Sequence, residues 1–281
     1  MKTRIITGVI GIALLLGVFI WSCYWPLAFY IAVAIISAVS ASEIVFATGF
    51  AKYKTIAVAA VAFSAFVPFS VLLSGATSFP VVQAVLFVYC VFLFTHTIFH
   101  HQGISFADLS VVFTTSLLVP FALSTMIYIW EIGQVHGLFY VVLILVGAWA
   151  SDIGAYFIGS FFGKHKLAPG ISPKKTVEGF AGGIAVCILA MVLVVAVYQR
   201  WLSPVEISVS YWAVALVAAL CSVISVAGDL TFSMIKRCYK IKDFGNVFPG
   251  HGGMLDRFDS VVFVAPLVYL LVQFLPVMGA V

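Results

Sequence analysis

The sequence predicts an all-α polytopic integral membrane protein, and three observations support this. Of the 281 residues, 64% are hydrophobic and 9% are charged, whereas about a quarter of residues are charged in soluble globular domains. The apolar residues come in runs of about 20, the length that a helix needs to cross a hydrocarbon core. Lipid cannot satisfy open sheet edges, so helices are expected to be the spanning elements.

The apolar runs predict about nine transmembrane helices. They are expected at residues 5–22, 26–47, 56–74, 79–99, 108–130, 137–160, 177–199, 211–235 and 258–278. An odd number of spans places the two termini on opposite sides of the membrane. The remaining question is which terminus faces the cytoplasm.

Basic residues favour a cytoplasmic N-terminus and a C-terminus outside. In that arrangement the inside loops are 1–4, 48–55, 100–107, 161–176 and 236–257, and they hold thirteen of the fourteen Lys and Arg residues. Lys and Arg accumulate in cytoplasmic loops and set orientation. The net charge of +4 is therefore explained by topology, and nucleic acid is not expected as a partner.

Acidic residues gather beside the last two basic loops, where topology alone does not require them. Six of the ten lie there: Asp152, Glu178, Asp229, Asp243, Asp256 and Asp259. Ionisable groups inside membrane helices are costly and are usually functional. A further acidic residue, Glu43 in the second span, is expected to make a structural hydrogen bond or a dimer contact, with a substrate role as the alternative.

The spacing of Asp256 and Asp259 suggests a metal ion. Three residues apart on a helix, they share a face and repel one another unless a cation lies between them. Carboxylate oxygens favour Mg²⁺ over zinc, and Mg²⁺ is often shared with substrate phosphates. We therefore expect Mg²⁺, with a second metal ion left open.

Two neighbouring segments are suited to phosphate. The basic residues around the sequence GNVFPGHGG, residues 245–253, suit anionic oxygens: Lys236, Arg237, Lys240, Lys242 and Arg257. We name residues 245–253 the glycine loop, and expect its backbone N–H groups to approach a phosphate. Within it, His251 either contacts phosphate or base, or shapes the turn.

The second segment is ISPKKTVEGFAGG. Ser172 is expected to be a helix N-cap with Pro173 in the first helical position. Lys174, Lys175 and Thr176 would then lie in the first helical turn, where N–H groups attract an anion. The glycines that follow, at 179, 182 and 183, are expected to allow close helix packing. Carboxylates, a divalent ion and two cationic platforms at a membrane together favour phosphoryl or nucleotidyl transfer to a lipid.

The segment SMIKRCYKIKDFGNVFPGHGGMLDRFD, residues 233–259, resembles the signature of phosphatidate cytidylyltransferases, the CDP-diacylglycerol synthases. Every fixed position of that signature is met. The segments SD...AY from Ser151, SPKKTVEG from Ser172 and GDL from Gly228 are also similar to this family, so the resemblance covers about residues 145–262. The N-terminal half is similar only in being a stack of apolar helices.

The resemblance implies a reaction of CTP with phosphatidate that gives CDP-diacylglycerol and pyrophosphate. It also implies a Mg²⁺-dependent homodimer in a bacterial inner membrane, with the active site facing the cytoplasm. The implied metal ligands are Asp229, Asp256 and Asp259. Catalytic roles are expected for Asp229, Lys236, Arg237, Asp256, Arg257 and Asp259. Substrate-binding roles are expected for Asp152, Ser172, Lys174, Lys175, Thr176, Ser233, Lys242, His251, Gly252 and Gly253.

Two parts of the chain are expected to differ in function. Residues 1–135 would serve anchoring, lipid access or dimer contacts, and residues 136–281 would form the catalytic region with loops 161–176 and 236–257. Three other functions remain open. A CTP-dependent polyprenol or phytol kinase would release CDP, a CDP-alcohol phosphatidyltransferase should show a different aspartate motif, and a transporter would use Asp152 and Asp229 as an ion path.

Overall fold

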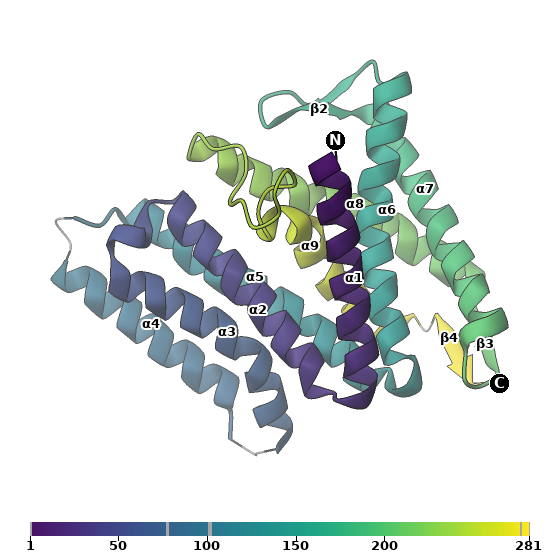
Figure 1. Cartoon of the computed structure of the whole chain (residues 1–281), viewed down its shortest axis with the longest axis horizontal. Helices are drawn as coiled ribbons and strands as arrows, with labels where there is room; N and C mark the ends of the chain where they lie inside the picture. The colour runs from purple at the N-terminus through teal and green to yellow at the C-terminus, as the bar shows by residue number, and fades with distance from the viewer. Residues whose placement is uncertain (1, 77–78, 101–102, 276, 281) are drawn as a thin grey trace. The chain divides into compact units, whose positions relative to one another are not determined.

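The computed structural model describes residues 2–76, 79–100, 103–275 and 277–280. These residues contain nine α-helices (Figure 1). The helices are α1 Lys2–Tyr24, α2 Leu27–Ala47, α3 Lys54–Ala76, α4 Val81–Phe99, α5 Phe106–Ile132, α6 Gly137–Phe162, α7 Val177–Val197, α8 Tyr211–Cys238 and α9 Leu255–Phe274. The all-α prediction is confirmed, and every predicted span overlaps one helix.

Short elements connect these helices. Two 3-10 turns lie at Phe50–Lys52 and Gln134–His136, and a π-helical turn follows α7 at Tyr198–Leu202. Within the described ranges, four strands form two antiparallel pairs: β1 Lys166–Ala168 with β2 Ser172–Thr176, and β3 Ile207–Val209 with β4 Met278–Ala280.

Eight of the helices, α1 to α8, are long and apolar enough to cross a membrane, as judged over the part of the chain that the structure describes. The protein is therefore a multi-pass membrane protein. The ninth predicted span corresponds to α9, which is not among those eight. Its first two turns carry three charged residues, Asp256, Arg257 and Asp259.

The chain divides into two compact units. The first unit combines the chain up to Ile127 with Tyr239–Phe258, and the second combines Tyr128–Cys238 with the chain from Asp259 on. The glycine loop and the first turn of α9 thus group with the N-terminal helices, although they follow α8 in sequence. This division matters for the site, because the signature segment contributes residues to both units.

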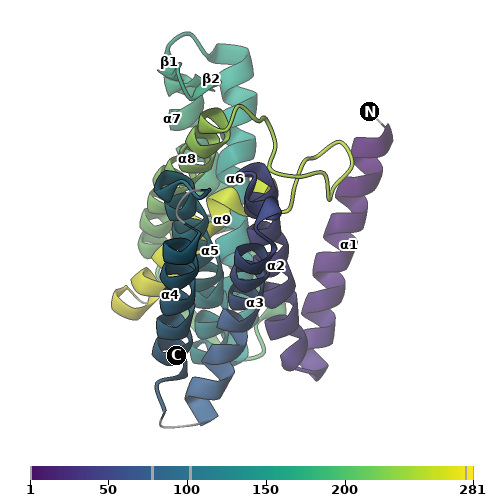
Figure 2. The same cartoon turned by 90° about the vertical axis from the view of Figure 1, so that its left-hand side faces the viewer.

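In the first unit, α2 packs against α1 and α3, and α3 packs against α4. An aromatic contact joins α3 to α4, where the rings of Phe63 and Tyr89 stack with centroids 4.1 Å apart. The buried Tyr89 hydroxyl then hydrogen-bonds Ser116 Oγ of α5 at 2.6 Å. The hydrogen bond gives the buried Tyr89 hydroxyl a polar partner. Figure 2 shows the loop before α9 reaching α1, in agreement with the contacts of His251 described below.

In the second unit, α6 packs closely on α7, and both contact α8. Glycines make this approach feasible. A Cβ atom at Gly182 would lie within 3.0 Å of three Ile158 side-chain atoms, and one at Gly154 would meet Val186 in the same way. The prediction of close packing at glycines 179, 182 and 183 is confirmed, because added methyl groups would collide with α6.

The region before α7 differs from the prediction. Ser172, Pro173, Lys174, Lys175 and Thr176 form strand β2 rather than an N-cap and a first helical turn. Thr176 is the actual N-cap, and its hydroxyl accepts the Gly179 N–H at 3.1 Å. The Pro-Gly turn in the sequence LAPGIS reverses the chain and lets β2 pair with β1, which the helix-start interpretation missed.

Candidate active site

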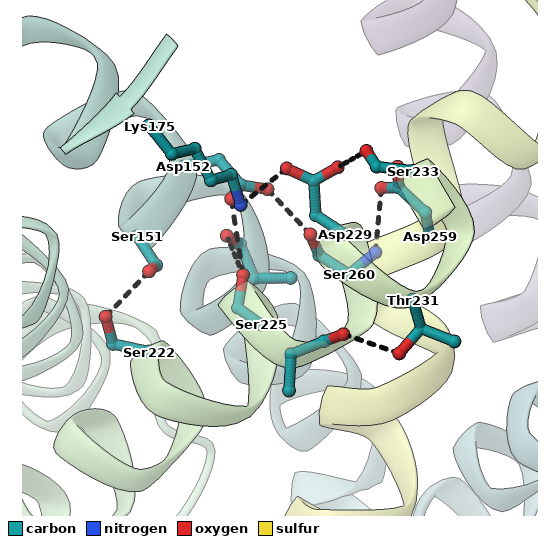
Figure 3. Close-up of polar contacts among 12 residues, drawn as sticks. Ser151, Asp152, Lys175, Ser222, Ser225, Asp229, Thr231, Ser233, Asp259 and Ser260 are labelled. Carbon is teal, nitrogen blue, oxygen red and sulfur yellow. Dashed lines mark hydrogen bonds and ion pairs between the residues drawn. The ribbon is translucent and has the colours of Figure 1, made fainter. Parts of the chain in front are cut away.

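Three carboxylates come together in the second unit, each from a different helix (Figure 3). Asp152 lies on α6, Asp229 on α8 and Asp259 on α9. Asp259 is buried, with 8% of its surface exposed. It lies within electrostatic range of both Asp229 and Asp152. Like charges held this close in an apolar environment require nearby cations or hydrogen-bond donors.

Serine hydroxyls supply several of those donors. Ser260 Oγ donates to Asp152 Oδ2 at 2.8 Å, and Ser225 Oγ lies 3.4 Å from Asp152 Oδ1. On α8, Ser233 Oγ donates to Asp229 Oδ1 at 3.1 Å. The sequence predicted a role for Ser233 but missed Ser225 and Ser260. Ser260 directly follows Asp259, a signal that could have drawn attention to it.

Two lysines balance the negative charge. Lys175 Nζ on β2 lies 2.6 Å from Asp229 Oδ2, and this ion pair is about three quarters buried. Lys236, on the last turn of α8, is 8% exposed and attracts the Asp259 carboxylate. The predicted residues Asp152, Lys175, Asp229, Lys236 and Asp259 therefore form one cluster, which we call the acid–lysine cluster.

The β1–β2 hairpin brings Lys175 to this cluster, and two contacts hold the hairpin itself. At its base, Glu178 accepts the backbone N–H groups of Lys164 and His165 at 3.0 and 3.2 Å. Near its turn, Ile171 O accepts Arg237 Nε of α8 at 3.2 Å. A charged side chain at the end of α8 thus anchors the strand that carries Lys175.

The first unit contains a second acidic group, Glu43 and Asp256. Asp256 Oδ2 accepts the backbone N–H groups of Phe244 at 2.8 Å and Gly253 at 3.0 Å. Glu43 on α2 accepts those of Met254 and Leu255. The structural hydrogen bond expected of Glu43 is confirmed, whereas its partners could not be predicted from sequence.

These contacts alter the role expected of the glycine loop. The N–H groups of Phe248, His251 and Gly252 are bonded to backbone oxygens inside the loop. Those of residues 253–255 are bonded to carboxylates. In this structure these N–H groups therefore already have partners within the chain, and the substrate-binding roles expected of Gly252 and Gly253 stay predictions. Gly252, with φ of +90°, instead allows the turn that closes the loop on Asp256.

The remaining predicted site residues lie around these two groups. His251 Nδ1 lies 2.7 Å from Thr7 Oγ1 of α1, a contact that shapes the turn and leaves the other ring nitrogen outside this hydrogen bond. Ser172 is half-buried on β2. Lys174, Lys242 and Arg257 are exposed at the surface of their units. The substrate-binding roles expected of His251, Ser172, Lys174 and Lys242, and the catalytic role expected of Arg257, stay predictions.

The acid–lysine cluster has the donor chemistry that Mg²⁺ requires. Among the described residues, no group of three or more His, Cys, Asp or Glu side chains is placed to hold a metal ion by itself. Mg²⁺ commonly uses only one or two carboxylates together with substrate phosphates. Asp229 and Asp259 therefore fit a magnesium ion that arrives with phosphate, and the role of Asp256 as a third ligand stays a prediction.

The fold and the site together define a polytopic membrane protein in which carboxylates from three helices lie close to two lysine side chains. A profile described as the cytidylyltransferase family matches residues 2–275. The chain belongs to this family, as the resemblance in the signature segment predicted.

Three relatives illustrate the similarity. The phosphatidate cytidylyltransferase of Bacillus subtilis is 38% identical over 179 residues, which cover 64% of each chain. That of Staphylococcus saprophyticus is 37% identical over 179 residues, covering 64% of this chain and 65% of its own. That of Synechocystis is 46% identical over 146 residues, covering 51% and 46%. The matches thus span less than two thirds of these relatives' length.

Proposed function

We propose that this protein transfers the cytidylyl group of CTP to phosphatidate, forming CDP-diacylglycerol and pyrophosphate. Family membership and the names of the relatives support this activity. The observation that carries it is the acid–lysine cluster, because five ionisable side chains within or beside membrane helices are costly unless they serve a charged substrate.

The proposed reaction needs no nucleophile from the protein. An ionised phosphate oxygen of phosphatidate attacks the α-phosphorus of CTP and forms a new P–O bond. The bond from the α-phosphorus to the bridging oxygen breaks, and pyrophosphate leaves with the electron pair. Lys175 and Lys236 would stabilise the charge that develops on the phosphate oxygens, and Asp152 would hold its position through Ser260.

Magnesium is part of the proposal. Asp229 and Asp259 would hold it together with substrate phosphates. When bound, the ion would neutralise phosphate charge and polarise the P–O bonds. The lysines already in the cluster supply part of the same neutralisation, so the ion and the protein would share that task.

The proposal places the N-terminus and the acid–lysine cluster on the cytoplasmic side of a bacterial inner membrane. Its support is the distribution of Lys and Arg over alternate loops. Contacts inside the second unit agree with it, since the 161–176 loop meets the C-terminal part of α8 through Lys175–Asp229 and Ile171–Arg237. Labelling of Lys164→Cys in an otherwise cysteine-free chain should occur in inside-out vesicles and not in right-side-out vesicles.

A homodimer is also proposed, on the family resemblance alone. Light scattering of the purified protein in detergent should give twice the mass of the 30.3 kDa chain after subtraction of the detergent. A mass of one chain at all concentrations tested would contradict it.

The activity can be tested with the full chain in detergent micelles. Labelled CTP and phosphatidate should give labelled CDP-diacylglycerol with Mg²⁺ and almost none after chelation. Release of labelled CDP without CDP-lipid would indicate a CTP-dependent kinase instead. The absence of any product from folded protein would contradict both activities.

A further inference from the structure

Glu43 is a buried acidic residue that the proposed chemistry does not use. It lies on α2, an apolar helix, and is 5% exposed. Both of its carboxylate oxygens accept backbone N–H groups, Oε1 from Met254 at 2.8 Å and Oε2 from Leu255 at 2.9 Å. The hydrogen bonds join residues more than 200 positions apart, at the point where α9 begins.

Two glycines of the glycine loop are shaped to this carboxylate. A Cβ atom at Gly245 or at Gly253 would lie within 3.0 Å of Glu43 side-chain atoms. Both ends of the loop therefore close around Glu43, and any larger residue would displace it.

The carboxylate also complements the helix end electrostatically. The first N–H groups of a helix lack partners within the helix and carry partial positive charge. Glu43 accepts two such groups, those of Met254 and Leu255, while Asp256 accepts the N–H groups of Gly253 and Phe244, which precede the helix. The two carboxylates together hold the start of α9 and both ends of the loop in one arrangement.

We propose that Glu43 is a positioning residue that holds the glycine loop on the first turn of α9, so that the charged residues of this turn are presented in a single geometry. The inference rests on the proposed cytidylyl transfer. It assigns to α2 a part in the site that the signature segment alone does not show.

Amide exchange tests the structural part without any need for catalysis. In Glu43→Gln one acceptor is replaced by an amide donor that faces a backbone N–H, so one of the two hydrogen bonds is lost. Deuterium uptake of peptides covering residues 244–255 should accelerate at least about tenfold. The exposed Glu206 of the second unit offers a matched control, because Glu206→Gln should leave this uptake unchanged. Unchanged uptake in Glu43→Gln would overturn the proposal.

Kinetics test the positioning role. We expect Glu43→Gln to lower kcat about 10- to 100-fold while the protein stays folded. The KM for phosphatidate should change much less, and Glu206→Gln should behave as wild type. Faster exchange with unchanged kcat would overturn a positioning role. If the wild-type protein makes no CDP-lipid, the proposed function fails, and the exchange result still decides whether Glu43 holds the loop.

A double-mutant cycle distinguishes the contact between Glu43 and Gly253 from a general folding defect. Gly253→Ala places a methyl group against the Glu43 carboxylate and should lower activity by itself. Combined with Glu43→Ala, which removes the carboxylate, the same methyl group should cause little further loss. Additive losses would show that the two residues act independently and would overturn the contact on which the inference depends.

Discussion

One pair of acidic side chains in each unit shows two different ways of satisfying a carboxylate. In the first unit, Glu43 and Asp256 accept backbone N–H groups. In the second unit, Asp152 and Asp229 accept serine hydroxyls and the Lys175 ammonium. A backbone donor ties a carboxylate to one chain conformation, whereas side-chain partners can move when a substrate arrives. The comparison suggests that the first pair maintains structure and that the second group takes part in chemistry.

The largest effect is expected at the centre of the second unit. Asp229→Asn removes a charge that pairs with Lys175 and would hold Mg²⁺, so turnover of CTP should fall at least about 1000-fold. Purified variant protein with unchanged unfolding temperature would show that the loss is chemical. Near wild-type turnover would mean that Asp229 has no role in metal binding and that the comparison is wrong for this residue.

Lys175→Met should lower turnover about 100-fold, because a positive charge beside the reacting phosphates is lost. A suitable control is Lys54→Met, which removes an exposed lysine at the start of α3 in the first unit. Steady-state rates at saturating CTP would measure both. Equal rates in the two variants would indicate that Lys175 serves only as the ion-pair partner of Asp229.

Asp256 and Asp259 lie three residues apart on α9 but should respond differently to the same substitution. Asp256→Asn weakens the two backbone contacts that close the loop and should destabilise the protein by about 1–3 kcal/mol. Asp259→Asn removes a charge that two other carboxylates repel and Lys236 attracts, and the amide oxygen can still accept the Ser260 N–H, so the unfolding temperature should change little. Thermal unfolding in detergent measures both, and equal destabilisation would remove the distinction between the units.

The smallest effects are expected where a single hydroxyl is removed. Ser260→Ala loses the hydrogen bond to Asp152 and should lower kcat several-fold with little change in stability. Thr7→Val loses the contact with His251 and should speed deuterium uptake in the glycine loop. If Ser260→Ala altered only stability, or Thr7→Val only kcat, this would contradict the structural role given to the first unit and the chemical role given to the second.

Much of the fold was predictable because the bilayer imposes a simple rule on sequence. Runs of about 20 apolar residues indicate helices regardless of their neighbours, and each predicted span overlaps a helix in the structure. The β1–β2 hairpin was not predicted, because Ser-Pro-Lys-Lys is also typical of a helix start. The Pro-Gly turn before it was the competing signal, and pairing with β1 decided between the two.

The candidate site was predictable only in part. Asp152 and Asp229 were found because charges inside apolar runs are conspicuous, and Asp259 because of its spacing from Asp256. Ser225 and Glu43 were harder, since serine is common in membrane helices and a lone glutamate does not reveal its partner. Their roles depend on contacts between helices and loops that are distant in the chain.

The sequence by itself determined the membrane class, the helices and the kinds of residue available for phosphate and metal, since these follow from local composition and spacing. Only the tertiary structure decided which charges meet. It gave Asp256 backbone N–H partners at the ends of the glycine loop, placed Asp259 near Asp229 and Asp152, brought Lys175 to Asp229 on a strand, and closed the glycine loop around Glu43. The physical reason is that a buried charge must find a partner, and the folded chain selects that partner from residues far away in the sequence.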